Sequence, residues 1–224
     1  MDKKALIIIG AGGHAKVLLD ILLAQKADIL GLTDADTASP GVGRHVLGVP
    51  VLGGDSQVPE HSPEDIRLVN ALGSVGRIGK RREIFQHFKA LGYSFASVFH
   101  PAAIISRLTE LGEGVQLMAG VVVQAGVVLG DNVLVNTRAS VDHDCRIGAH
   151  AHLAPGAILS GGVTLGEGVH VGTGAVIIQG ITVGEGSVIG AGAVVIRDVP
   201  SGVTVAGNPA RVSNAVQGCR TGNS

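Results

Sequence analysis

The chain has 224 residues, of which 17 are Lys or Arg and 18 are Asp or Glu, so its formal net charge is −1. This balance lacks the basic character of a nucleic-acid-binding protein, and a chain with no Trp and one Tyr offers few side chains for base stacking. We therefore expect no nucleic-acid partner, and the length allows one or two domains with a sizeable core.

The first 34 residues have the pattern of a nucleotide-binding βαβ unit. A buried strand over residues 5–9 leads into a glycine turn at residues 10–14 (GAGGH), apolar residues at helical spacing from 17 to 22, and a second apolar run that ends at Asp34. Glycines let the backbone approach a phosphate, and the N-terminus of the helix offers it unpaired N–H groups. The match to GxGxxG is imperfect because Ala15 holds the last place, so a tight turn that serves only packing is the alternative.

Three more elements complete a first domain: a strand over residues 66–72 followed by Gly73, a helix over residues 80–91, and a closing segment at 95–99. We assign residues 1–98 to a Rossmann-like α/β domain. It lacks the second half of a full dinucleotide fold, which argues against NAD. The short apolar run near the N-terminus indicates a strand rather than a secretory signal, and no run is long enough for a membrane span, so we expect a cytoplasmic protein.

Residues 105–200 repeat with a period of six. The first place of each hexad is Ile, Leu or Val from Ile105 through Val195, and the fifth place is small or uncharged from Thr109 through Val199. A second period of 18 places glycine in one column at residues 112, 130, 148, 166, 184 and 202. This self-similarity predicts a solenoid, here an all-β parallel β-helix of triangular cross-section over residues 99–206, with the first and fifth side chains inside.

The outward places of the coil hold one unusual cluster, Asp142-His143-Asp144. Flanking carboxylates stabilise a protonated imidazole and make it a better proton acceptor near neutral pH, so His143 is a candidate general base. The alternative is a solvated histidine without a role. We expect no metal site, because the nearby histidines fall on different places of their hexads. Cys145 occupies an inward fifth place, where we expect a core residue rather than an acyl carrier.

The segments IIIGAGGHAK, HPAAIIS, NTRASVDHDC and GNPARV, together with Asp34 and the hexads, resemble one family over nearly the whole chain. It is the family of nucleotide-sugar 4-amino N-acetyltransferases, which includes the related sialic acid O-acetyltransferases. The resemblance implies a left-handed β-helix and a homotrimer with active sites at the coil interfaces. It also implies acetyl-CoA as the donor and a nucleotide-linked amino sugar as the acceptor.

The resemblance also assigns site residues. It places the catalytic histidine at His143, with Asp144 as the acid that follows it, and a second histidine that contacts the acetyl group at His152. It implies sugar-nucleotide contacts for Gly12, Gly13, His14, Asp34 and Gly73. Coenzyme contacts are implied for Thr173 and Ala191, which are 18 residues apart and therefore stack in one column. Residues 207–224 are expected to form a coenzyme-side segment and a disordered tail.

The chain departs from the family pattern in two places. The family often has paired acids at the end of the second strand, whereas Ala35 here separates Asp34 from Asp36, which leaves the nucleotide open. The family often has Glu after the catalytic histidine, and Asp144 in this place should preserve the chemistry.

His143 and His152 are nine residues apart, which is half of an 18-residue turn, so we expect them on opposite sides of one coil. If both act on one acetyl group, one of them must come from a neighbouring subunit. Trimerisation is then a requirement for activity.

The favoured interpretation is an acetyl-CoA-dependent enzyme that acetylates the C4 amine of a nucleotide-linked 4-amino-4,6-dideoxy sugar by direct transfer. UDP is favoured as the nucleotide, and GDP or dTDP are possible. One alternative is an O-acetyltransferase that acts on sialic acid. A non-enzymatic alternative is a trimeric scaffold that senses a nucleotide and does not bind acetyl-CoA.

Overall fold

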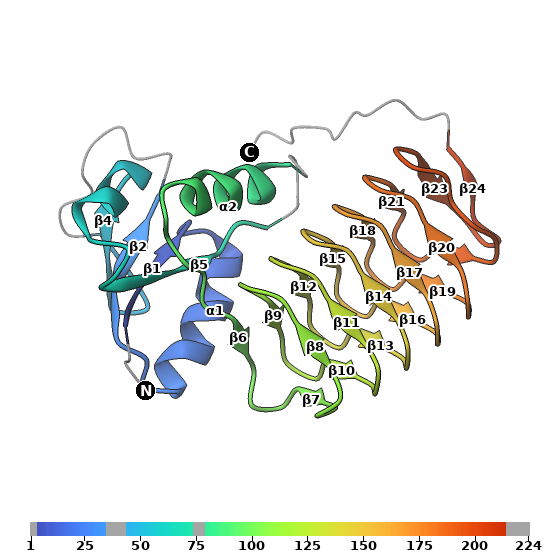
Figure 1. The fold of residues 1–224 in the computed structure, drawn as a ribbon, viewed down its shortest axis with the longest axis horizontal. Coiled ribbons are helices and arrows are strands. Elements are labelled where there is room, and N and C mark those ends of the chain that lie inside the picture. Colours follow the sequence, from blue (N-terminus) through green and yellow to red (C-terminus); the bar gives the residue numbers. More distant parts are fainter. Residues whose placement is uncertain (1–3, 35–43, 74–78, 214–224) are drawn as a thin grey trace.

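The structure is a computed structural model that describes residues 4–34, 44–73 and 79–213. An α/β domain forms one end of the molecule, and a β-helical coil extends from it to the other end (Figure 1). Ala35 and Asp36, which separate this chain from the family pattern, lie outside the described residues, as does Cys219.

The α/β domain is built on a five-stranded sheet of order β3-β4-β2-β1-β5. Its strands are β1 (Ala5–Ile9), β2 (Ile29–Thr33), β3 (His45–Val46), β4 (Val49–Gly53) and β5 (Ile66–Asn70). The helices are α1 (Gly13–Ala24), a 3-10 helix η1 (Asp55–Glu60) and α2 (Lys80–Ala90). Strands β2 and β5 flank β1 in parallel, as the βαβ pattern predicted.

Strand β1 is apolar at consecutive residues because both of its faces are covered. Leu6 and Ile8 pack into the core that includes α1 and the coil, whereas Ile7 and Ile9 pack into a second core with Phe85 of α2. The sheet therefore separates two apolar layers, and the first of these layers joins the α/β domain to the coil.

The coil has three parallel sheets, which we call faces 1, 2 and 3 in the order in which the chain visits them. Face 1 contains β6 (Val98–Phe99), β9 (Gln116–Leu117), β12 (Leu134–Val135), β15 (His152–Leu153), β18 (His170–Val171), β21 (Val188–Ile189), β23 (Thr204–Ala206) and the antiparallel β24 (Arg211–Val212). Face 2 contains β7 (Ile104–Ile105), β10 (Val122–Val123), β13 (Ser140–Val141), β16 (Ile158–Leu159), β19 (Val176–Ile177) and β22 (Val194–Val195). Face 3 contains β8 (Glu110–Leu111), β11 (Val128–Leu129), β14 (Arg146–Ile147), β17 (Thr164–Leu165) and β20 (Thr182–Val183).

The predicted hexad pattern is confirmed in the strand register. Partners on successive turns are 18 residues apart, as in His152 opposite His170 and Ser140 opposite Ile158. From Val115 through Val199 the side chains of the first and fifth places are buried. The interior is therefore a filled apolar core, and only outward places and corners can carry chemistry.

The glycine column is confirmed from residue 112 to residue 184 but is wrong at Gly202. Val188 pairs with Thr204, 16 residues on, so the last turn is two residues shorter than the others. Gly184 consequently lies against Ser201. Gly202 lies instead in the column of Gly186. Both glycines have positive φ, and the N–H of each donates to the carbonyl of a glutamate on the preceding turn.

Face 1 is the side of the coil that the α/β domain covers. Gln116, Leu134 and His152 point outward from this face and are nonetheless buried. Helix α2 is tied to the coil by ion pairs from Arg82 to Glu167 (2.8 Å) and from Lys89 to Glu113 (2.7 Å). Among the described residues, no helix combines the length and apolar character that crossing a membrane requires.

Candidate active site

A cleft of about 740 Å³ lies between the α/β domain and face 1 of the coil. Its α/β side is formed by the carboxyl ends of β1, β2 and β5 with the start of α1, and its coil side by Leu134, Asn136 and His152. Ligands of open α/β sheets bind at the carboxyl ends of the strands. Five residues with implied sugar-nucleotide contacts line this cleft: Gly12, Gly13, His14, Asp34 and Gly73.

Three glycines of the cleft adjoin space that no atom of the described residues fills. A Cβ at Gly12, Gly13 or Gly73 would meet no described atom within 4 Å, so packing of the described residues does not require glycine there. Gly12 is the N-cap of α1 and supplies no side-chain hydrogen bond, which leaves the first N–H groups of the helix available to an anion. The arrangement suits a phosphate group that approaches the backbone closely.

Charged residues that the sequence pattern did not single out also line the cleft. Arg44 bonds Asp34 at 2.6 Å, and the Thr33 hydroxyl donates to Asp55 at 2.6 Å. Lys80, at the start of α2, adds a cation. Asp55 is the first residue of η1, which follows β4, and Lys80 is the first residue of α2, which follows β5. Their positions just after sheet strands are the sequence signal that could have indicated them.

His14, which is partly buried, and His152, which is buried, are neutral imidazoles in the cleft. Burial lowers the pKa of His14 to about 4, although its hydrogen bond to Gln116 acts in the opposite direction. Burial, with smaller contributions from His170 and Arg81, lowers the pKa of His152 to about 3. Neither ring nitrogen of His152 has a hydrogen-bond partner among residues 4–34, 44–73 and 79–213, and its ring lies edge-on to the ring of His170 at 4.9 Å between centroids. An unpartnered buried imidazole is available to a ligand in the cleft.

His143 lies elsewhere, on the exposed corner between faces 2 and 3. Its Nδ1 bonds a carboxylate oxygen of Asp144 at 2.8 Å, and its backbone N–H donates to Asp142 at 2.8 Å. The hydrogen bond to Asp144, and then the charge of Asp142, raise the pKa of the imidazole. Since Nδ1–H faces the carboxylate, Nε2 is the nitrogen that can accept a proton from a substrate.

The neighbours of His143 fit an exposed base. A Cβ at Gly161 would lie 2.6 Å from Cε1 and Nε2 of His143, so glycine lets the ring lie across the next turn.

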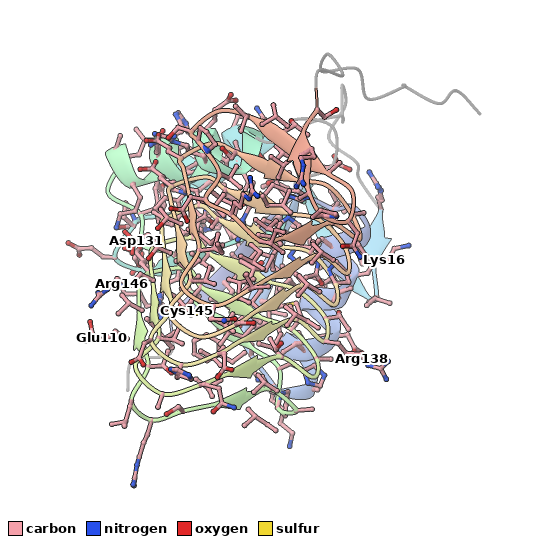
Figure 2. All side chains as sticks on the ribbon, turned by 90° about the vertical axis from the view of Figure 1, so that its right-hand side faces the viewer. Lys16, Glu110, Asp131, Arg138, Cys145 and Arg146 are labelled. Carbon is pink, nitrogen blue, oxygen red and sulfur yellow. The ribbon has the colours of Figure 1, made fainter. Side chains whose placement is uncertain are left out.

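Cys145 is fully buried, and burial raises the pKa of its thiol. Figure 2 shows Cys145 inside the coil wall, whereas Arg146 points outward. The expectation that Cys145 is a core residue is confirmed.

Thr173 and Ala191 lie on the corner between faces 1 and 2. They are exposed and stack on successive turns, since the N–H of Gly192 donates to the carbonyl of Thr173 at 2.8 Å. One chain therefore presents three separate groups: the cleft with His152, this corner column, and His143. His152 shares the cleft with the implied sugar-nucleotide residues, and neither His143 nor the corner column lines it.

Four successive hexads break the corner rule of the coil. From residue 114 to residue 192 the fourth place of each hexad has positive φ and is glycine in most hexads, but it is Asn132, Arg138, Asp144 and His150 in the hexads around the site. A residue with a Cβ costs about 1–2 kcal/mol in this conformation, so side chains are retained here against strain. Asn132 and His150 bond each other beneath α2, and Asp144 bonds His143. Among the described residues, no group of three or more His, Cys, Asp or Glu side chains is arranged so that it could hold a metal ion.

Comparison with known proteins agrees with the repeat and with the α/β domain. Residues 5–88 match the PglD N-terminal domain, and residues 126–161 and 162–197 match the six-repeat bacterial transferase hexapeptide model. PerB from Caulobacter crescentus, crystallised with CoA and GDP-perosamine, is 41% identical with a TM-score of 0.85 over 94% of this chain and 97% of its own. The acetyltransferase domain of PglB from Neisseria gonorrhoeae, whose structure was solved in complex with acetyl coenzyme A, is 42% identical with a TM-score of 0.85 over 94% of this chain and 100% of its own. WeeI from Acinetobacter baumannii is 27% identical with a TM-score of 0.83 over 93% and 99%.

The repeat and the fold define a hexapeptide-repeat acyltransferase, whose coil is a left-handed β-helix behind an N-terminal α/β domain. More closely, the chain belongs to the family of sugar acetyltransferases that includes PerB and the PglB acetyltransferase domain. The expected family and fold class are confirmed.

Proposed function

We propose that the protein transfers the acetyl group of acetyl-CoA to the C4 amine of a nucleotide-linked 4-amino-4,6-dideoxy sugar. The observation that carries the proposal is the cleft, in which an unfilled glycine turn at a helix N-terminus lies near a buried His152 that has no hydrogen-bond partner within the described part of the chain. A relative with 41% identity was crystallised with CoA and GDP-perosamine, which supports both substrate classes.

In this proposal the diphosphate of the sugar nucleotide lies at Gly12, Gly13 and the N-terminus of α1, where partial positive charge favours an anion. Asp34 and Gly73 contact the remainder of the nucleotide. The sugar then extends across the cleft towards the coil, where His152 and Asn136 line the wall.

Nε2 of His143 removes a proton from the amine as the amine nitrogen attacks the thioester carbonyl. The C–S bond breaks when the tetrahedral intermediate collapses, the nitrogen keeps the acetyl group, and the CoA sulfur leaves as the thiolate and takes up a proton. Asp144 raises the basicity of His143, as their 2.8 Å bond supports. His152, or a backbone N–H, stabilises the developing oxyanion. General-base assistance is typically worth about 10²–10⁴ in rate.

The reaction requires a second copy of the chain, because one chain holds His143 and His152 apart. Face 2 of the coil supplies a surface for it: Ile104 and Ile158 are 68% and 44% exposed, and Val122, Val176 and Val194 occupy the same outward column. This column is apolar except at Ser140, and an exposed apolar surface of this kind is typical of one that another molecule covers. In the proposed homotrimer, His143 of one subunit meets the cleft of its neighbour, and acetyl-CoA runs along Thr173 and Ala191.

The acceptor is tested by measuring acetyl transfer to UDP-, GDP- and dTDP-linked 4-amino-4,6-dideoxy sugars beside free and CMP-linked sialic acid. We expect N-acetylation of one nucleotide-linked amino sugar. The preference for UDP stays a prediction, and the GDP-perosamine complex of PerB makes GDP the competing outcome. Acetylation of sialic acid alone would overturn the proposal in favour of an O-acetyltransferase.

A further inference from the structure

Gln116 is a fully buried polar side chain that joins the coil to the cleft. It points outward from β9 on face 1, and its exposed fraction is 0% because the α/β domain covers it. Its Nε2 donates to the backbone carbonyl of Asn70 at 2.7 Å, and its Oε1 lies 2.9 Å from Nε2 of His14. These two bonds connect the end of β5, the coil and the start of α1.

The orientation of the Gln116 amide follows from its partners. The carbonyl oxygen of Asn70 can only accept hydrogen bonds, so the NH₂ group of Gln116 must face it. The amide oxygen then faces His14 and can only accept, so Nε2 of His14 must carry the proton. For the neutral imidazole, Nδ1 is left without a proton and is the acceptor nitrogen.

The carbonyl of Asn70 is itself held in place. It also accepts from the buried guanidinium of Arg81 at 2.6 Å, and the same Arg81 nitrogen donates to the carbonyl of Leu72 at 3.1 Å. The side chain of Asn70 donates to the carbonyl of Arg81 at 2.9 Å. Because Ala71, Leu72 and Gly73 line the cleft, the carbonyl that holds Gln116 directly precedes a segment of the ligand site.

We propose that Gln116 is a positioning residue that fixes His14 as the Nε2–H tautomer, so that His14 meets the ligand of the cleft through Nδ1 as a hydrogen-bond acceptor. The partner of His14 is then a hydroxyl or another donor of the sugar nucleotide, and not a phosphate oxygen, which at neutral pH offers no proton. The ligand class rests on the proposed function, whereas the tautomer rests on Gln116 and Asn70 alone.

The tautomer is read directly from ¹⁵N chemical shifts of the imidazole in ligand-free protein labelled at histidine, with His14 assigned by its absence in His14→Phe. We expect a pyridine-like Nδ1 and a protonated Nε2 in the wild type. In Gln116→Met, which removes both bonds at similar volume, we expect a mixture of tautomers. Gln179→Met, at an exposed coil glutamine, serves as the matched control and should leave the His14 signals unchanged.

Ligand binding is measured by calorimetry with whichever of UDP and GDP the wild type binds more tightly. We expect Gln116→Met to weaken it by about tenfold, the effect of one lost hydrogen bond, and Gln179→Met to leave it unchanged. A protonated Nδ1 in the wild type, or a His14 tautomer that Gln116→Met does not change, would overturn the inference. If Gln116→Met does not fold, the wild-type spectrum decides alone. If the wild type acetylates no sugar nucleotide but its His14 is the Nε2–H tautomer, the result would refute the proposed function and not the inference about Gln116.

Discussion

The bond between His143 and Asp144 gives a test at the level of one residue. A general base must be unprotonated, so kcat/KM should rise with pH through the pKa of His143, which Asp144 and Asp142 raise above 6.5. Asp144→Asn removes the charge at a site with φ +60°, a conformation that Asn tolerates. We expect the midpoint of the acid limb to move to lower pH and the plateau to fall by about tenfold.

The control for this change is Asp142→Asn, since the charge of Asp142 contributes less than the Asp144 hydrogen bond. It should shift the midpoint in the same direction by a smaller amount. A midpoint that is identical in wild type and Asp144→Asn would show that another group controls the acid limb.

The buried His152 predicts a loss of stability in acid. Its pKa is about 3 in the folded protein and about 6.5 in the unfolded chain, so the unfolded chain binds more protons below pH 6.5. The free energy of unfolding should therefore be unaffected above pH 7 and fall by about 2 kcal/mol for this group between pH 7 and pH 5. His152→Phe should remove that part of the slope in urea denaturation at fixed protein concentration.

The exposed His87 provides the matched comparison, because His87→Gln removes a histidine that the fold does not bury. Its slope between pH 7 and pH 5 should equal that of the wild type. If His152→Phe leaves the slope unchanged, His152 does not resist protonation in the folded protein.

Residue-level prediction from the sequence succeeded where partners are adjacent in the chain. Asp144 follows His143 directly, so their bond could be anticipated. His14 and Gln116 are 102 residues apart, and no period or motif connects them. His152 was correctly placed on an outward position, but its burial depends on the α/β domain that covers face 1, which the hexad pattern does not contain.

Among the elements, the coil corners contain two kinds of glycine that are two residues apart. A Cβ at Gly166 would lie 2.5 Å from the backbone nitrogen of Glu185 on the next turn, whereas a Cβ at Gly168 would meet nothing within 4 Å. Gly168 has φ +65°, so Gly168→Ala should cost about 1–2 kcal/mol of conformational strain. Gly166→Ala must separate two coil turns and should cost about 3 kcal/mol or more.

Chemical denaturation of the two variants checks the order of these costs. Equal losses, or a larger loss for Gly168→Ala, would contradict the stacking of corners at Gly166. The pair is matched, because both positions lie in one corner and gain one methyl group.

The sequence was most informative about the elements of the coil, because the same strand and corner recur in every hexad. The strand places and buried columns followed from the period. The exception is the final turn, where Val188 pairs with Thr204 and Gly202 leaves its expected column. A turn shortened by two residues keeps inward and outward places unchanged, since strand side chains alternate with period two, so the shift is invisible in the hydrophobic pattern.

For the whole molecule, the apolar column of face 2 predicts the effect of a charge at Ile158. Ile158→Glu would bury a carboxylate in the proposed subunit interface without a partner, a change that costs several kcal/mol. We expect light scattering to report monomers and acetyl transfer to be lost. Leu91→Glu, which alters a residue that is 48% exposed beyond α2, should remain trimeric and active. A trimeric Ile158→Glu variant would place the interface elsewhere.

Mixed trimers test whether one site uses two chains. His143→Ala and His152→Phe should each lose most activity alone, but a site formed by His143 of one subunit and His152 of its neighbour is restored wherever the two variants meet in the right order. Each hybrid of a closed trimer contains one such junction among its three. Equal mixing through a denatured state should therefore recover roughly a quarter of the wild-type sites. If both histidines act within one chain, the hybrids contain no intact site and show no recovery.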